Sequence, residues 1–150
     1  MKVSALLAVA VSWSLAARAD DAPKPKPPST EEQLVAALAS AQWGPVPAPL
    51  AKGALASLIG VDPATGGATA YSKLPAGYRV PRHFHSHAEY TVVIAGKATF
   101  TMDGKPREVQ AGSYLVIPAK VHHEVVCGAG AECVLLTRRA GPTDYNFVNP

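Results

Sequence analysis

The residues best suited to chemistry are histidines, and the 150-residue chain places all five of them in two clusters: His83, His85 and His87, then His122 and His123. Residues two apart on a β-strand share a face, so His83 and His85 can bring two imidazoles to one point. Glu89 follows closely and adds a carboxylate. Together with one histidine of the second cluster, this donor set suits Fe(II), Mn(II), Co(II), Ni(II) or Zn(II), and it suits Ca(II), Mg(II) and Cu(I) poorly.

The identity of such a metal decides what kind of protein this is. A six-coordinate ion with four protein ligands keeps two positions for water, dioxygen or a substrate oxygen, which favours an enzyme. A tetrahedral zinc ion would be saturated by the same four ligands, which favours a metal-stabilised scaffold. The sequence predicts the site and leaves the metal open.

The elements that must position these side chains are short strands. From Gly53 onward, apolar runs alternate with glycine, proline and aspartate, and Asp103-Gly104 is a type I′ hairpin signal. The pattern predicts an all-β sandwich or small barrel. The expected strands are 54–61, 68–74, 90–94, 98–102, 107–110, 114–117, 122–126 and 133–137.

Strand alternation assigns a face to the residues of the second cluster. His123 shares its face with Cys127 and is expected to point inward, whereas His122 and Glu124 are expected on the outer face. His87 is placed at the mouth of the site, although it could ligate instead of His85 or Glu89. A Ser-His-Asp arrangement would have to use the histidines of the metal site, which argues against that class of enzyme.

Cationic side chains flank the expected ligands. Arg79, Arg82 and Lys120, with His87, form a candidate substrate rim that could attract a small anionic molecule, and the competing interpretation is solvated surface charge. Arg138-Arg139 is expected to be an ordinary solvated strand end.

Two cysteines, Cys127 and Cys133, bracket a short loop between two expected strands. Their Cα atoms could come within bridging distance across a hairpin, and an oxidising compartment would favour a disulfide. Because Cys127 has inward parity, a thiol close to the metal remains the alternative.

The first 19 residues have the form of a signal peptide, with Lys2 ahead of an apolar stretch and Ala17-Arg18-Ala19 as a cleavage site. A secreted or periplasmic protein without a membrane anchor after cleavage is therefore expected. Loss of Lys2 and Arg18 removes two charges from the net +3, leaving +1. With no basic run interleaved with aromatics, the chain lacks the features of a nucleic-acid binder.

Residues 20–28 form a proline-lysine linker that is expected to be disordered, and residues 29–52 are expected to hold a short helix and a proline-rich lead-in. Ser29 and Glu32 fit a capping box. Trp43 is expected to anchor this helix on the barrel of residues 53–150, and a partner-binding Trp43 is the alternative.

Two spaced motifs carry a family resemblance. Gly77, five residues, His83-x-His85, three residues, Glu89, six residues and Gly96 resembles the first motif of the cupin superfamily. Gly112, five residues, Pro118 and then His123 resembles the second, and the pair is similar to that of small secreted single-domain cupins. The resemblance covers roughly residues 53–137.

The resemblance implies a double-stranded β-helix, the jelly-roll barrel, with His83, His85, Glu89 and His123 as metal ligands. Lys120 and Cys127 depart from the family, which has glycine and asparagine there, and the first change suggests a different turn after Pro118.

Two functions from different classes follow. One is an exported cupin that binds a divalent transition metal and a small ligand without turnover. The other is a metal-dependent dioxygenase or decarboxylase that acts on a small carboxylate or phenolic compound. A sensor role resembling cupin domains of anti-sigma factors is weaker, since no separate sigma-binding domain is expected in this chain and export argues against that role. An exposed edge strand would invite a homodimer.

Overall fold

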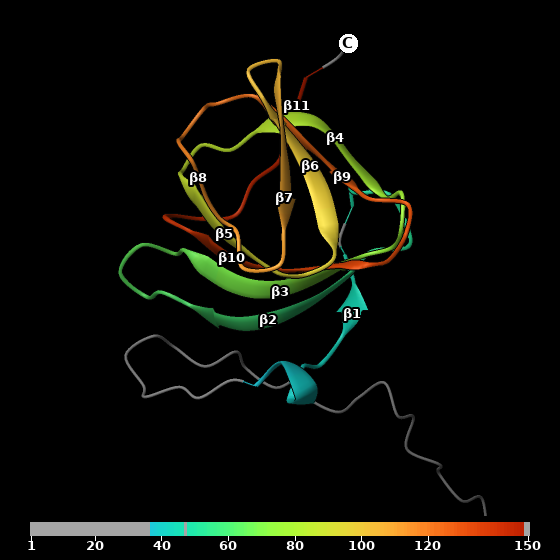
Figure 1. The fold of residues 1–150 in the computed structure, drawn as a ribbon. Coiled ribbons are helices and arrows are strands. Elements are labelled where there is room, and N and C mark those ends of the chain that lie inside the picture. The colour runs from blue at the N-terminus through green and yellow to red at the C-terminus, as the bar shows by residue number, and fades with distance from the viewer. Residues whose placement is uncertain (1–36, 47, 149–150) are drawn as a thin grey trace, which may run out of the picture.

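Two antiparallel sheets face each other in the computed structural model, which describes residues 37–46 and 48–148 (Figure 1). The six-stranded sheet has the order β1-β2-β3-β10-β5-β8, with β1 (Gly44–Pro45), β2 (Leu55–Val61), β3 (Ala68–Leu74), β10 (Cys133–Arg139), β5 (Glu89–Ala95) and β8 (Tyr114–Ile117). The five-stranded sheet has the order β11-β4-β9-β6-β7, with β11 (Asn146–Phe147), β4 (Arg79–Phe84), β9 (His123–Cys127), β6 (Lys97–Met102) and β7 (Lys105–Gln110).

This all-β arrangement agrees with the predicted jelly-roll fold, and the expected strands lie close to the observed ones. Alternation explains the agreement: in β5, Glu89, Thr91 and Val93 are buried and the residues between them are not. The Asp103-Gly104 turn joins β6 to β7 with φ values of 45° and 78°, as a type I′ turn requires.

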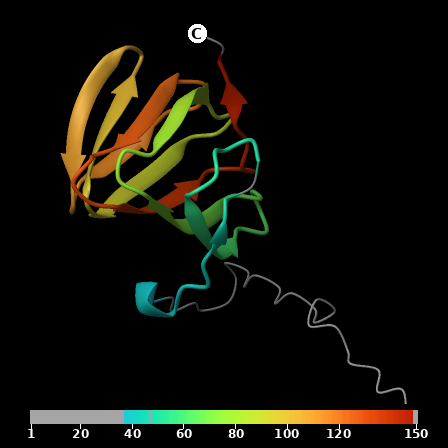
Figure 2. The same ribbon diagram turned by 90° about the vertical axis from the view of Figure 1, so that its right-hand side faces the viewer.

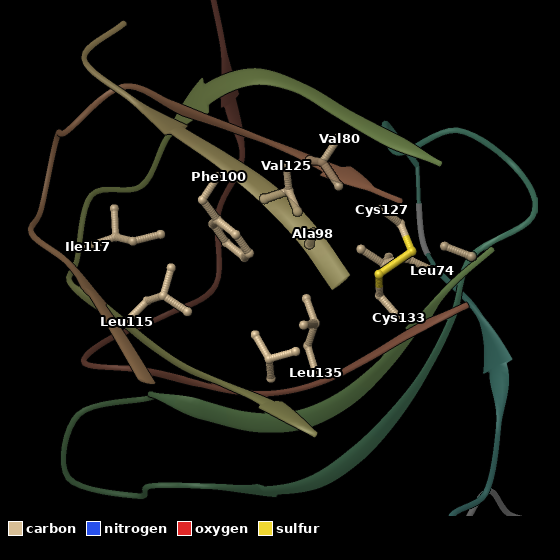
Figure 3. Packing of buried hydrophobic residues seen from close by; sticks show 12 residues of the cluster. Leu74, Val80, Ala98, Phe100, Leu115, Ile117, Val125, Cys127, Cys133 and Leu135 are labelled. Atoms are coloured by element: carbon tan, nitrogen blue, oxygen red, sulfur yellow. A yellow bond between two sulfur atoms is a disulfide. The ribbon is translucent and has the colours of Figure 1, made fainter. Parts of the chain in front are cut away.

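Apolar side chains fill the space between the sheets (Figure 3). Phe100 of β6 and Val93 of β5 are fully buried, and Leu135 of β10 is buried in the same cluster on the side of the six-stranded sheet. Packing of this kind fixes the distance between the two sheets. Polar residues are buried mainly at one end of this core, and that end holds the candidate site.

At the other end, a disulfide joins the two sheets. Cys127 is the last residue of β9, Cys133 is the first residue of β10, and their Cα atoms are 5.8 Å apart. Both side chains are buried in the core, so the inward parity of Cys127 is compatible with the bond. A free thiol near the metal, the alternative considered from the sequence, is therefore wrong.

The described part of the N-terminal segment contains one turn of 3-10 helix, η2 (Leu38–Ser40), rather than the expected amphipathic helix. Figure 2 shows this turn outside the two sheets. Trp43 is half-buried, and Lys73 Nζ lies 4.3 Å from the centre of its ring. The expected signal peptide (1–19), linker (20–28) and capping box at Ser29 lie outside the described residues. Within residues 37–46 and 48–148, no helix is long and apolar enough to span a membrane.

Candidate metal centre

Three imidazoles meet inside the barrel. His83 lies near the end of β4, His85 follows that strand, and His123 begins β9. Their side chains are buried, and one ring nitrogen of each lies within 4.8 Å of the others. The Nε2 atoms of His83 and His85 are 3.2 Å apart. The structure thus brings together the three histidines that the sequence predicted as ligands.

A β-bulge in β4 aims His83 into the barrel. Val80 pairs with Val125 and His83 pairs with His123. The chain advances three residues on β4 but only two on β9 between these pairs, so β4 contains one extra residue. Val80 and His83 are both buried even though they differ in parity. Without the bulge, Arg79 would share the inward face of His83.

The bulge corrects the predicted substrate rim. Arg79 lies on the outer face, where Nη2 bonds Oε2 of Glu124 at 2.6 Å. Arg82 is also exposed, and its Nη2 lies 3.3 Å from Nδ1 of His122. The extra residue in β4 turns Arg79 to the outer face, and Arg82, adjacent to the inward His83, faces outward by ordinary alternation.

Backbone carbonyls fix the tautomer of each histidine in the cluster. Nδ1 of His83 lies 2.7 Å from the carbonyl oxygen of Pro81, and Nδ1 of His123 lies 3.0 Å from that of Val121. Nδ1 of His85 contacts the carbonyl oxygen of Asp144. A carbonyl oxygen only accepts hydrogen bonds, so each Nδ1 carries the proton. The three Nε2 atoms therefore turn their lone pairs toward one another.

Burial keeps these imidazoles neutral. Desolvation, with the neighbouring His123, lowers the pKa of His83 from 6.5 to about 3, and desolvation with the nearby Arg139 lowers the pKa of His85 to about 4. Burial also lowers the pKa of His123. Near neutral pH the three Nε2 atoms are therefore unprotonated, and their lone pairs remain free to bind a cation. This donor set fits a divalent transition-metal ion.

Glu89, the predicted fourth ligand, begins β5 and faces the cluster from the opposite sheet. Its Oε2 lies 3.1 Å from Nε2 of His85 and 4.0 Å from Nε2 of His123. The hydroxyl of Thr91 donates to Oε1 at 2.7 Å, and Oε2 forms an ion pair with Arg139. Glu89 is thus within reach of the site but is held by a guanidinium.

Arg139 corrects the interpretation of the Arg138-Arg139 pair. Arg138 is exposed and lies 3.4 Å from Asp62, as a strand-end residue should. Arg139 is buried at 6% exposure and faces Glu89. The sequence carried the signal, because Arg139 shares the inward parity of Leu135 and Thr137 on β10.

The C-terminal segment also contributes to the site, which sequence reasoning did not predict. Residue Asp144 bonds the backbone nitrogen and hydroxyl of Ser86 through its carboxylate. The Tyr145 ring lies 5.0 Å from that of His85, and β11 pairs with β4 so that Phe147 is opposite His83. No motif spacing marks this segment, because it reaches the site by pairing at a sheet edge.

The other predicted site residues surround the cluster without entering it. His122 lies on the outer face, as predicted, and stacks on Phe84 with ring centres 5.4 Å apart. His87 is exposed and packs against Gly141. Lys120 is exposed with a φ of 65°, so the turn keeps the left-handed conformation that glycine favours.

A cavity of about 320 Å³ opens beside the cluster. His83, Glu89, Arg139 and Tyr145 line its polar end. Small and apolar side chains of β2 and β3 line much of the rest: Ala56, Leu58, Ala68, Ala70, Ser72 and Leu74. The volume is at the lower end for a small-molecule site.

Comparisons with known proteins agree with this fold. Residues 70–137 match the family model described as the cupin domain. Dimethylsulfoniopropionate lyase DddW of Ruegeria pomeroyi is 35% identical over 52 residues, which cover 35% of this chain and 34% of that protein. The match thus spans about a third of the curated relative.

Solved structures share the fold at low identity. The polyketide cyclase RemF from Streptomyces resistomycificus gives a TM-score of 0.66 at 20% identity, covering 79% of this chain and 87% of that chain. An RmlC-like cupin from Shewanella frigidimarina gives 0.62 at 16% identity, covering 75% and 95%. The match over residues 70–137 and the shared two-sheet fold support the assignment of this barrel to the cupin superfamily.

Proposed function

We propose that the protein is an exported metal-binding cupin. His83, His85 and His123 would hold a divalent transition metal through Nε2, with Glu89 as the fourth ligand, and a small molecule would occupy the adjacent cavity. The observation that carries this proposal is the convergence of three Nε2 lone pairs while every Nδ1 faces a carbonyl. Three buried acceptors that converge without a donor among them are an arrangement that a transition-metal ion would satisfy.

The test compares two neighbouring histidines on opposite faces of β9. Elemental analysis of protein purified from its native compartment should find a stoichiometric transition metal. His123→Ala should weaken metal affinity by more than about 100-fold, since even the loss of an outer partner of a ligand costs 10- to 100-fold. His122→Ala should leave the affinity within about twofold. Equal losses in both variants would contradict the site.

An enzyme is the second candidate, favoured by the cavity that meets His83 and Glu89 at its polar end. A bound metal ion with open coordination positions would supply Lewis acidity or redox chemistry to a ligand there. The chain's own residues would exclude water and hold the proton of each imidazole at Nδ1, so Nε2 stays available. Dioxygenase, decarboxylase and, from the partial match to DddW, lyase reactions belong in the first activity screen.

The metal itself separates the two candidates. Iron or manganese with exchangeable water, detected by magnetic resonance, together with turnover of a small acid, would support the enzyme. Stoichiometric zinc with saturated coordination and no oxygen consumption would support the binding protein. Export is tested separately, by sequencing the N-terminus of the mature protein. The Cys127–Cys133 disulfide favours an oxidising compartment.

A further inference from the structure

Arg139 is a buried cation that the proposed metal site does not explain. Its side chain is 8% exposed, with Nη1 against Oε2 of Glu89, and the more exposed carboxylate of Asp144 also acts on it electrostatically. Cζ of Arg139 also lies 5.6 Å from the centre of the Tyr145 ring. A guanidinium stays ionised in proteins, so burying it requires a nearby negative charge.

Glu89 supplies that charge, but it faces other groups as well. The same Oε2 that contacts Arg139 lies 3.1 Å from Nε2 of His85, on the side of the histidine cluster. Without a metal ion, Glu89 and Arg139 neutralise each other. With a divalent ion among three neutral imidazoles, the buried charges of the ion, Glu89 and Arg139 amount to +2, and the carboxylate of Asp144, 33% exposed beside His85, lowers the net charge to +1. An uncompensated buried charge is costly, so the metal-loaded site favours an additional anion.

The cavity beside Arg139 restricts the kind of anion. Its charged lining residues are Glu89 and Arg139, and alanines of β2 and β3 form an apolar wall. At about 320 Å³ it has room for about ten water molecules, or for a ligand of similar size. A ligand that fits would carry one anionic group and an apolar body.

We propose that Arg139 binds the carboxylate of a small organic acid, with the apolar part of the acid against the alanine wall. The anion site forms when a divalent metal occupies the histidine cluster, because the metal then competes with Arg139 for Glu89. This inference rests on the proposed metal site. Metal and acid should therefore bind cooperatively, and each should raise the affinity for the other by the same factor.

Isothermal titration calorimetry with butyrate tests the proposal on the intact protein, with and without zinc. Zinc is redox-inert, so the readout is binding and not turnover. We expect zinc-loaded protein to bind butyrate at least tenfold more tightly than metal-free protein. Butyramide, which has a similar shape and no charge, should bind zinc-loaded protein at least tenfold more weakly than butyrate.

Arg138 and Arg139 provide a matched pair of variants. Arg139→Gln should weaken butyrate binding to the zinc-loaded protein by roughly 10- to 100-fold, the range expected for a hydrogen bond to a charged group. Arg138→Gln should leave binding within about twofold, since Arg138 is exposed on the outer face. Butyrate should raise the zinc affinity of the Arg138→Gln protein and have no effect on that of Arg139→Gln.

The outcomes separate this inference from the proposed function. Failure of the wild-type protein to bind zinc contradicts the metal site itself. Tight zinc binding with equal butyrate affinities in the two arginine variants leaves the metal site standing and overturns the role of Arg139. Should Arg139→Gln not fold, the wild-type comparisons decide: equal binding of butyrate and butyramide, or equal butyrate binding with and without zinc, overturns the proposal.

Discussion

The strands β9 and β10 have very different ends. At one end, Cys127 and Cys133 join the two sheets through a covalent bond within the apolar core. At the other end, Nε2 of His123 lies 4.0 Å from Oε2 of Glu89 in the opposite sheet, Arg139 of β10 contacts the same carboxylate, and no covalent bond joins these residues. The two ends are about 13 Å apart along β9.

The difference separates stability from binding. The disulfide end needs no further partner, because its sulfur atoms are bonded and its neighbours are apolar. The histidine end gathers neutral acceptors, a carboxylate and a guanidinium that a metal ion would rearrange. A barrel closed at one end can keep its opposite end ready for a ligand, at a cost in folding free energy that the closed end helps to offset.

Lowering the pH should destabilise the folded protein through the buried histidines. Burial lowers the pKa of His83 from 6.5 to about 3 and that of His85 to about 4. Below pH 6.5 the unfolded chain therefore binds protons at these histidines that the folded chain does not bind, which favours unfolding. The contribution of these groups is fully present about one pH unit above 6.5 and is lost as the pH falls through 6.5. The free energy of unfolding of the metal-free protein should fall by on the order of 3 kcal/mol between pH 6.5 and 5, measured by urea titration. A flat profile in this window would contradict the neutral, buried cluster.

Adding a metal ion should raise the free energy of unfolding by binding to the same histidines. Zinc at 100 times its dissociation constant should raise the free energy of unfolding by about 2.7 kcal/mol at pH 7.5, because it binds the folded chain. Thermal unfolding with and without zinc measures this gain. His123→Ala should lose the gain and His122→Ala should keep it; a gain retained by both would place the metal elsewhere.

Removal of the disulfide should leave the histidine end intact. Cys127→Ala combined with Cys133→Ala should lower the free energy of unfolding by about 2 kcal/mol, since the loop it closes is short. Zinc affinity, measured by competition with a chelator, should stay within about twofold. A large loss of zinc affinity would show that the two ends are coupled through β9 and β10.

Lys120, on the turn just before β9, gives the smallest effect. Its φ of 65° favours glycine, so Lys120→Gly should raise the free energy of unfolding by about 1 kcal/mol. Lys105→Gly is the control: Lys105 is exposed at the start of β7, and glycine in a strand should destabilise by about the same amount. Chemical denaturation of both variants checks the opposite signs.

Local pattern predicted most of the fold and the centre of the site. Alternation and turn residues placed the strands, and the Asp103-Gly104 turn has the predicted geometry. The spacing of His83 and His85 predicted two converging imidazoles, and parity separated His123 from His122. These features depend on neighbouring residues, which a sequence displays directly.

The features that were missed depend on contacts between distant parts of the chain. A single extra residue in β4 turned Arg79 outward, and no local signal marks that bulge. Charge predicts a solvated Arg139, whereas its parity on β10 places it on the inner face, where the carboxylate of Glu89 lies. Asp144, which precedes β11, reaches His85 across 59 positions of sequence, because β11 pairs with β4 in a way that motif spacing does not show.

The main-chain partners of the histidines bear on how such a site changes in evolution. The proton of each Nδ1 is held by a peptide carbonyl, which every amino acid supplies. Replacing Pro81, Val121 or Asp144 would alter a side chain and leave that acceptor in place. Ring orientation can then survive extensive sequence divergence as long as the backbone path is kept, so chains with few identical residues can inherit the same imidazole geometry.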